Sequence, residues 1–161
     1  QVPREAWRDM FSAAEQEIRI LVYSGLFLAD DAGIMELLAE RAKDRVKIRI
    51  LLGDPESKTV NQRGREEHIG ESMAARVNNS LLLFRVLQEI DNVEIRTHST
   101  TLYNSTYSTE QKIFVNQHIY GLPAAKCPVF EISRFASPGI SELYLKSFNL
   151  TWEDSIKQGR L

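Results

Sequence analysis

The sequence predicts an α/β domain with parallel strands flanked by helices, and two observations carry this prediction. A helical segment joins two apolar, β-branched segments at 17–27 and 45–54, which is the pattern of a strand–helix–strand unit. The last third of the chain returns to short strand-like segments before a final helix. With 161 residues, 43% of them hydrophobic and 26% charged, the chain is long enough to bury the core of one globular domain.

The first strand is expected near 18–23, within EIRILVYSGLF. Its apolar side chains occupy both faces, with Ile18, Ile20 and Val22 on one and Leu21 and Tyr23 on the other. Such a run is typical of a strand that is covered on both sides. Ahead of it, apolar residues recur at helical spacing and predict a short helix: Ala6, Trp7, Met10, Phe11 and Ala14.

A capped helix and a second strand follow. Asp30 or Asp31 is suited to cap this helix. The apolar positions of the helix are Ile34, Leu37, Leu38 and Ala42. The second strand is expected near 46–52, within RVKIRILLGD, and GDPES ends it. A strand, a helix and a strand with short links predict a parallel pair with a right-handed crossover.

Residues 58–89 predict a long helical insertion. This segment has no proline, and of its two glycines, Gly64 and Gly70, the second marks where a break in the helix would fall. Its apolar stripe consists of Ile69, Met73, Ala74, Val77, Leu81 and Phe84. The opposite side carries Arg63, Arg65, Glu66, Glu67, His68, Glu71 and Arg76. We interpret these charges as a solvated helix face, in preference to a ligand-binding patch.

The last third of the chain predicts four strands and a helix. The strands are expected at 93–99, 101–107, 111–117 and 127–134, and the helix at Glu142–Ile156. No internal repeat or low-complexity stretch interrupts the chain. Residues 1–161 are therefore interpreted as a single domain.

Composition argues against several classes of function. The net charge of −2 gives no strong attraction to nucleic acid or to a membrane, and no apolar run approaches the length of a membrane span. The single cysteine, Cys127, rules out an intramolecular disulfide, and nothing indicates secretion, so a cytoplasmic location is expected. No His, Cys and carboxylate residues have metal-ligand spacing, and there is no glycine-rich phosphate loop. We therefore expect neither a metal nor a cofactor.

Two blocks of the chain resemble a phospholipase D-like domain. One is the strand–helix–strand segment 17–57, and the other is the late block in which QKIFVN is followed by a glycine, a strand and a helix ending in SFNLTWED. The resemblance covers nearly the whole chain apart from 58–89. It implies a phospholipase D-like mixed sheet flanked by helices.

The resemblance is closer to a bacterial subgroup in which such a domain follows an N-terminal helix-turn-helix of the xenobiotic-response-element type. ILVYSGLFLADDAGI, VKIRILLGDP, TLYNSTY and VNQHIYGLPAA are similar to the signatures of that subgroup. This similarity implies that the chain is the C-terminal fragment of a longer regulator, which fits the linker-like start QVPREAW.

Phospholipase D-like enzymes carry the motif His-x-Lys-x4-Asp, in which the His attacks phosphorus, the Lys neutralises phosphate oxygens and the Asp orients the His. Aligned on Lys112, the His position holds Glu110 and the Asp position holds Gln117. No other register restores the motif, because no histidine is followed two residues later by a lysine. A carboxylate would repel the phosphate that it must attack. The resemblance thus implies the fold but argues against the reaction, and no catalytic residue is predicted.

The surviving Lys112 has two interpretations. We favour a surface ion pair with Glu110, two residues away, over the remnant of a phosphate site that is retained for binding. Polar and aromatic side chains are expected to line a vestigial cleft around it. The candidate ligand-binding residues are Lys112, Glu110, Gln117, Asn116, His98, Tyr103, Asn104 and Tyr107. The alternative for these residues is an ordinary structural or surface role.

Two classes of function remain. We favour a non-catalytic regulatory domain of a bacterial transcriptional regulator, which senses a phosphate-bearing small ligand or mediates dimerisation, with DNA binding in an absent N-terminal part. The alternative is a divergent phosphodiesterase that uses another nucleophile. The resemblance also implies a homodimer, because single-motif domains of this kind pair about a two-fold axis, with Lys112 near the axis cleft.

Overall fold

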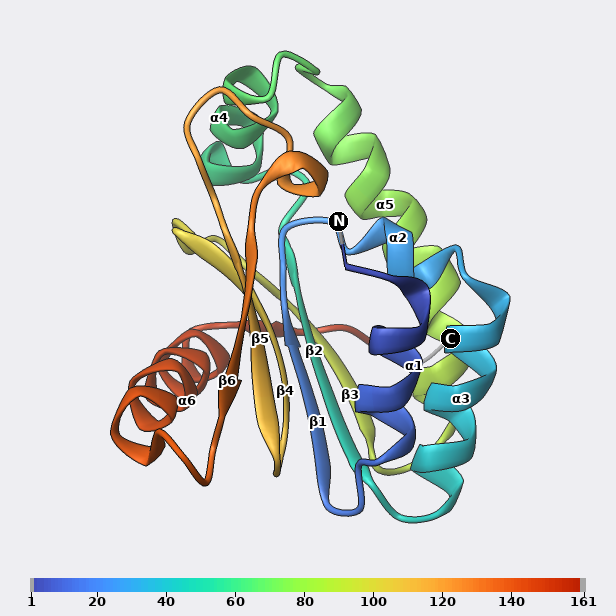
Figure 1. Cartoon of the computed structure of the whole chain (residues 1–161). Coiled ribbons are helices and arrows are strands. Elements are labelled where there is room, and N and C mark those ends of the chain that lie inside the picture. Colours follow the sequence, from blue (N-terminus) through green and yellow to red (C-terminus); the bar gives the residue numbers. More distant parts are fainter. Residues whose placement is uncertain (1, 160–161) are drawn as a thin grey trace.

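A computed structural model describes residues 2–159, which form one seven-stranded sheet with helices on both faces (Figure 1). The strands are β1 (Glu17–Leu21), β2 (Lys47–Gly53), β3 (Val93–His98), β4 (Asn104–Thr109), β5 (Lys112–Gln117), β6 (Val129–Ser133) and β7 (Ile156–Lys157). Their order across the sheet is β6-β5-β4-β1-β2-β3-β7.

The sheet is mixed, as predicted. β1 runs parallel to β2 and β2 parallel to β3, with Ile20 beside Ile50 and Ile50 beside Ile95. The remaining strands join antiparallel. The strand–helix–strand unit predicted from the first third of the chain is confirmed.

Six α-helices within the described residues flank the sheet. They are α1 (Arg4–Ser12), α2 (Leu26–Ala29), α3 (Ala32–Lys43), α4 (Lys58–Glu66), α5 (Ser72–Phe84) and α6 (Pro138–Glu153). Short 3-10 turns cover Arg85–Glu89 and Ala124–Lys126. Helices α1, α3 and α5 lie on one face of the sheet and α6 on the other (Figure 1). None of the helices within residues 2–159 is long and apolar enough to cross a membrane.

Local signals account for most of the helix ends. The Asp31 side chain accepts hydrogen bonds from the backbone N–H groups of Gly33 and Ile34, so Asp31 rather than Asp30 is the cap of α3. Helix α6 begins at Pro138, four residues before the predicted start at Glu142, because proline is well tolerated in the first turn of a helix.

The core has two unequal parts. The larger part lies between the sheet and α1, α3 and α5, where Ile18, Ile20, Phe11, Leu38 and Phe84 are among the fully buried residues. On the opposite face, Leu21 and Leu51 pack against Phe148 of α6. The two-sided covering of the first strand is confirmed. Tyr23 departs from the predicted alternation, because β1 ends at Leu21 and Tyr23 joins the larger part.

The helical insertion is present at 58–89, and it breaks where Gly70 was expected to break it. The Gly64 carbonyl accepts hydrogen bonds from the N–H groups of Ile69 (3.0 Å) and Gly70 (2.9 Å), which ends α4. Gly70 has φ of +52°, a conformation that glycine adopts without strain. The predicted solvated charged face is wrong in part, because Arg63 and Glu67 are buried.

The close approach of α4 to α5 makes Gly64 sensitive to any side chain. A Cβ at this position would overlap the Gly70 carbonyl oxygen and lie 3.1 Å from the Met73 Cβ. We expect Gly64→Ala to lower the free energy of unfolding by roughly 1–3 kcal/mol, measured by urea denaturation. Gly139→Ala is the control, because a Cβ there meets no atom within 4 Å. It should be neutral or stabilising by up to about 1 kcal/mol, and equal losses in both variants would contradict the packing argument.

Candidate functional site

The eight candidate residues do not form one cluster. Glu110 and Lys112 lie at the β4–β5 turn, whereas Asn116 and Gln117 lie at the opposite end of β5. Lys112 and Gln117 are five residue steps apart along an extended strand, which corresponds to about 16 Å. The two ends of β5 must therefore be considered as separate places.

At the β4–β5 turn, the Glu110 side chain caps the start of β1. Its carboxylate accepts hydrogen bonds from the backbone N–H groups of Glu15 (2.7 Å), Gln16 (3.3 Å) and Glu17 (3.2 Å). Burial alone would raise the pKa of Glu110, but these N–H donors together outweigh burial and lower it. The side chain at the nucleophile position of the motif therefore binds the backbone at the start of β1.

Lys112 pairs across strands and not along its own strand. Its Nζ lies 2.9 Å from Oε1 of Glu131 on the neighbouring β6. The expected ion pair between Lys112 and Glu110 is wrong, because Glu110 lies in the turn before β5, where its carboxylate faces the start of β1. The Lys112–Glu131 pair is solvent-accessible, and such pairs contribute little to stability.

Glu110→Gln is expected to lose about 1–2 kcal/mol of free energy of unfolding at neutral pH, because an uncharged amide is a weaker acceptor for three N–H groups. The folded-state pKa of Glu110 is lowered, so its contribution is fully present above the unfolded pKa. The contribution is lost as the pH falls through the lower, folded-state pKa. The difference in free energy of unfolding between Glu110→Gln and wild type, measured by urea denaturation, should be smaller at about pH 3 than at about pH 7. Glu131→Gln is the control. A difference in free energy of unfolding between Glu110→Gln and wild type that does not change with pH would contradict the capping role.

The other end of β5 lies beside the carboxyl ends of the parallel strands, where ligand sites of α/β sheets occur. His98 ends β3 here and is buried. Its Nε2 donates to the Val22 carbonyl (2.9 Å), and its Nδ1 accepts from the Thr100 N–H (3.2 Å). Burial, more than any other cause, lowers the pKa of His98. Its ring joins two backbone segments.

In the TLYNSTY segment, some side chains are exposed to solvent and others line a cavity. β4 begins at Asn104 and not at 101 as predicted, because the Leu102 N–H donates to the Tyr23 hydroxyl (2.8 Å) and holds the preceding residues as a loop. Tyr103 is 76% exposed. Gln117 donates to the Tyr103 carbonyl (3.4 Å). Tyr107, in contrast, is buried and lines a cavity.

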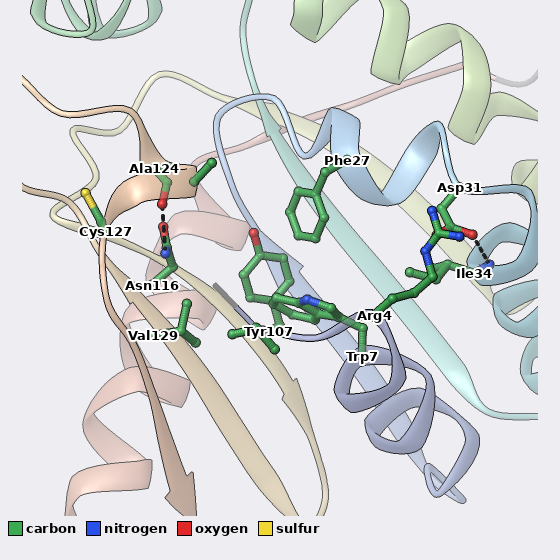
Figure 2. Close-up of a pocket in the computed structure, with 12 residues that line it drawn as sticks. Arg4, Trp7, Phe27, Asp31, Ile34, Tyr107, Asn116, Ala124, Cys127 and Val129 are labelled. Atoms are coloured by element: carbon green, nitrogen blue, oxygen red, sulfur yellow. Dashed lines mark hydrogen bonds and ion pairs between the residues drawn. The ribbon is translucent and has the colours of Figure 1, made fainter.

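This cavity, of about 330 Å³, lies between the N-terminal helix, α2 and the loop that follows β5 (Figure 2). Its aromatic floor is made by Trp7, Phe27 and Tyr107, with Trp7 and Tyr107 in an edge-to-face contact at 4.6 Å. Polar groups stand at two sides. One side has the Arg4–Asp31 ion pair (2.8 Å), and the other has the amide of Asn116, which donates to the Ala124 carbonyl (3.2 Å).

A second cavity, of about 400 Å³, lies beside the first. The two share Phe27, Tyr107, Ala124 and Ala125 in their walls, and we call them together the aromatic groove. The lining of the second cavity includes Ser105, His118, Arg63, Arg76, Glu67 and Asp30. We call this part of the aromatic groove the polar end, and the part lined by Trp7 and Ile34 the apolar end.

His118 and Ser105 form the hydrogen-bonded pair at the polar end. The Ser105 Oγ lies 2.9 Å from the His118 Nε2, and the His118 Nδ1 lies 3.3 Å from the Leu102 carbonyl. The His118 ring stacks on Tyr23 at 5.9 Å. Burial, followed by the charge of Arg63, lowers the pKa of His118 to about 4. Neither His118 nor Ser105 is among the ligand-binding residues predicted from the sequence. The alternation of Ser105 with Tyr107 on one strand face was the signal that could have found it.

A buried ion pair supports the wall of this end. The Arg63 Nε lies 2.7 Å from the Glu67 Oε1, and both side chains are buried. The Arg63 Nη2 also donates to the Leu122 carbonyl (3.2 Å), which ties the loop after β5 to α4. Within residues 2–159, no three His, Cys, Asp or Glu side chains are grouped to hold a metal ion.

Comparison with known proteins identifies the fold but no family. No protein-family profile and no curated protein sequence matches this chain. Among solved structures, TrmBL2, an archaeal chromatin protein with a novel mode of DNA binding, is 15% identical with a TM-score of 0.59, over 96% of this chain and 49% of TrmBL2. The chain therefore spans about half the length of TrmBL2.

The second similar structure is Nuc from Salmonella typhimurium, a phospholipase D family member. It is 14% identical with a TM-score of 0.54, over 96% of this chain and 90% of Nuc. At this level of identity the likeness shows a shared fold and nothing about the reaction. The chain has a phospholipase D-like fold.

Proposed function

We propose that this phospholipase D-like domain is a non-catalytic regulatory module of a bacterial transcriptional regulator, which senses a small ligand and pairs with a second copy. The observation that carries the proposal is the role of Glu110. It occupies the nucleophile position of the motif, and its carboxylate accepts three backbone N–H groups at the start of β1. A side chain engaged in this way is a structural cap and leaves Lys112 without a partner nucleophile.

The link to DNA rests on two supports. One is the likeness of the fold to TrmBL2, whose structure is described by its DNA binding. The other is the resemblance of the sequence to domains that follow a helix-turn-helix. A net charge of −2 favours DNA contact through another part of the protein. The sequence of the complete reading frame tests this, and a catalytic domain in place of a helix-turn-helix before residue 1 would contradict it.

The aromatic groove is the proposed sensing site, in place of the cleft expected around Lys112. Its apolar floor and its few polar groups suit a small, mainly apolar or aromatic ligand. In a Trp152→Phe variant Trp7 is the single tryptophan and lies in the floor of the groove. We expect 2-naphthol to change its fluorescence saturably and to raise the melting temperature by ligand linkage.

Two matched variants test the location of binding. Ala124 lines both cavities, so Ala124→Trp should fill the groove and abolish the response to 2-naphthol. Ala136 lies in an exposed turn after β6, and Ala136→Trp should leave the response unchanged. If Ala124→Trp bound 2-naphthol as wild type does, the aromatic groove would not be the site.

The proposed contact with a second copy uses α6 and the edge strand β6. Large apolar side chains are exposed there: Phe130, Phe135, Ile140, Leu143 and Leu150. Ile140, Leu143 and Leu150 follow the spacing of one helix face. This fits the two-fold pairing that the resemblance implies, with Lys112 in register with Ser133 of β6.

Light scattering of the isolated domain tests the pairing. We expect a dimer at high micromolar concentration, and a monomer would count against the proposal. Leu143 is 68% exposed on α6 and Leu82 is 61% exposed on α5, so the two leucines make a matched pair. Leu143→Glu should give a monomer, whereas Leu82→Glu should leave the dimer intact.

A turnover assay separates this proposal from the phosphodiesterase alternative. We expect no hydrolysis of bis-p-nitrophenyl phosphate, phosphatidylcholine or single-stranded DNA, because no imidazole stands at the motif to form a phosphohistidine. Turnover that disappears in Lys112→Ala would overturn the proposal and establish a divergent hydrolase.

A further inference from the structure

The Ser105–His118 pair has a fixed direction of hydrogen bonding. The Leu102 carbonyl can only accept, so the His118 Nδ1 carries the proton in this contact. The His118 Nε2 is then an acceptor, and the Ser105 hydroxyl donates to it at 2.9 Å. This is the arrangement of a hydroxyl nucleophile, a base and a group that orients the base.

Three neighbouring segments hold these groups in place. Ser105 lies in β4, where it pairs in register with Asn116 of β5. The backbone N–H of His118 donates to the Tyr103 carbonyl (3.0 Å), which holds the end of β5 against the loop before β4. The Tyr23 hydroxyl accepts the Leu102 N–H at 2.8 Å, so the orienting carbonyl is itself fixed. Each group is positioned by backbone contacts, which is the rigidity that a reacting pair needs.

A buried serine and histidine often only satisfy each other's hydrogen-bonding groups. His98 is an example in this fold of a histidine whose hydrogen bonds are structural. Both ring nitrogens of His98 contact the backbone, and the ring is not part of the lining of the polar end of the aromatic groove. Ser105 and His118, in contrast, both line the polar end of the aromatic groove. The hydroxyl is therefore placed where a small molecule can reach it.

The protonation state of His118 suits proton acceptance from a hydroxyl. With its pKa lowered to about 4 by burial and by Arg63, the imidazole is neutral at neutral pH. The same low pKa makes it a weak base toward the Ser105 hydroxyl and toward water alike, so acylation of Ser105 is itself expected to be slow. An acyl group transferred to Ser105 would consequently be released slowly.

The surroundings indicate what the hydroxyl would react with. The charged side chains that line the polar end balance, with Arg63 and Arg76 against Glu67 and Asp30. This neutral balance does not favour a doubly charged phosphate group. The adjoining apolar end, floored by aromatic rings, suits an uncharged acyl or aryl group.

We infer that Ser105 is a nucleophile activated by His118, and that the aromatic groove is acylated by carboxylic esters or thioesters with a small apolar acyl group. This inference rests on the proposed sensing function and names its ligand class. The Ser105 Oγ forms a bond to the carbonyl carbon while its proton passes to the His118 Nε2. The bond from that carbon to the leaving oxygen or sulfur breaks, His118 returns the proton to the leaving group, and the acyl group stays on Ser105.

Incubation with p-nitrophenyl butyrate tests the inference. We expect a burst of one equivalent of p-nitrophenol and a mass increase of one butyryl group that maps to Ser105. Ser108→Ala is the matched control, because Ser105 and Ser108 are both 5% exposed but lie on opposite faces of β4. Ser108→Ala should react as wild type does, and Ser105→Ala should not react.

His118→Gln should slow acylation by about 10²–10⁴-fold, the usual contribution of a positioned base. In wild type the acylation rate should stay constant from neutral pH downward and fall through the pKa of about 4. No adduct, or an adduct that persists in Ser105→Ala, would overturn the inference. The reversible response of Trp7 to 2-naphthol is independent of this chemistry, so it separates failure of the nucleophile from failure of the sensing site.

Discussion

Glu67→Gln is expected to lower the free energy of unfolding by about 3–5 kcal/mol, because it leaves the buried Arg63 guanidinium without its carboxylate partner. Glu66 cannot replace that partner, since its Oε2 lies 3.7 Å from the Arg63 Nη1 and its side chain is more exposed. The measurement is urea denaturation with the slope checked against wild type. Because Arg63 also holds the Leu122 carbonyl, the loop over the aromatic groove should loosen in the same variant.

Two further variants show whether charge burial causes this loss. Glu66→Gln removes a carboxylate from the same helix and should cost less than about 1 kcal/mol. The double variant Arg63→Met with Glu67→Met removes both charges and should recover most of the stability, since a buried pair is often replaceable by apolar side chains. A double variant as unstable as Glu67→Gln would show that packing around Arg63, and not its charge, is what matters.

Trp7→Ala is expected to lose about 3–5 kcal/mol, because a large buried aromatic side chain is removed and the space is only partly refilled. The Trp7 ring contacts Phe11, Phe27, Tyr107 and Phe114, with centroid distances of 4.6 to 6.3 Å. Its removal should therefore lower the melting temperature and widen the floor of the aromatic groove. Thermal and urea denaturation measure the first effect, and loss of 2-naphthol stabilisation measures the second.

Trp7→Phe is the matched control. It keeps an aromatic ring against Tyr107 and should lose less than half as much stability as Trp7→Ala. Trp152→Phe changes a tryptophan on the other face of the sheet, where the ring stacks on Phe148, and should leave ligand stabilisation unchanged. A Trp7→Ala protein that is as stable as wild type would contradict the placement of α1 in the core.

Local periodicity predicted the parts of the fold that depend on neighbours in sequence. The β1, α3 and β2 unit was predictable from short stretches of sequence. Ile18 and Ile20 have strand spacing, and Ile34 and Leu38 have helical spacing. The break at Gly70 was predictable from one residue, since glycine adopts φ of +52° without strain. The start of β4 was placed three residues early, at 101 against Asn104, because its position depends on a hydrogen bond to distant Tyr23.

The site depends on contacts between residues that are far apart in the sequence. Glu110 accepts from Glu15, 95 residues away, and that contact decides that it is a cap. Arg63 and Glu67 have the spacing of a solvated helical pair but are buried, and Arg63 donates to the Leu122 carbonyl of the loop after β5. Tyr107 and Asn116 were among the predicted ligand-binding residues and do line the aromatic groove. Ser105 becomes noticeable only when the register of β4 and β5 brings it to His118.

The position of β1 at the centre of the sheet has a consequence for synthesis on the ribosome. β1 pairs with β2 on one side and with β4, which ends at Thr109, on the other. At about 5–20 residues per second, roughly 4–18 s pass between translation of Leu21 and of Thr109. During this interval one edge of β1 presents unpaired backbone groups and the apolar Ile20. Nascent chains stalled at His98 should therefore recruit chaperones or aggregate, whereas chains stalled well beyond Ser133 should resist proteolysis, which pulse proteolysis of arrested ribosome complexes would measure.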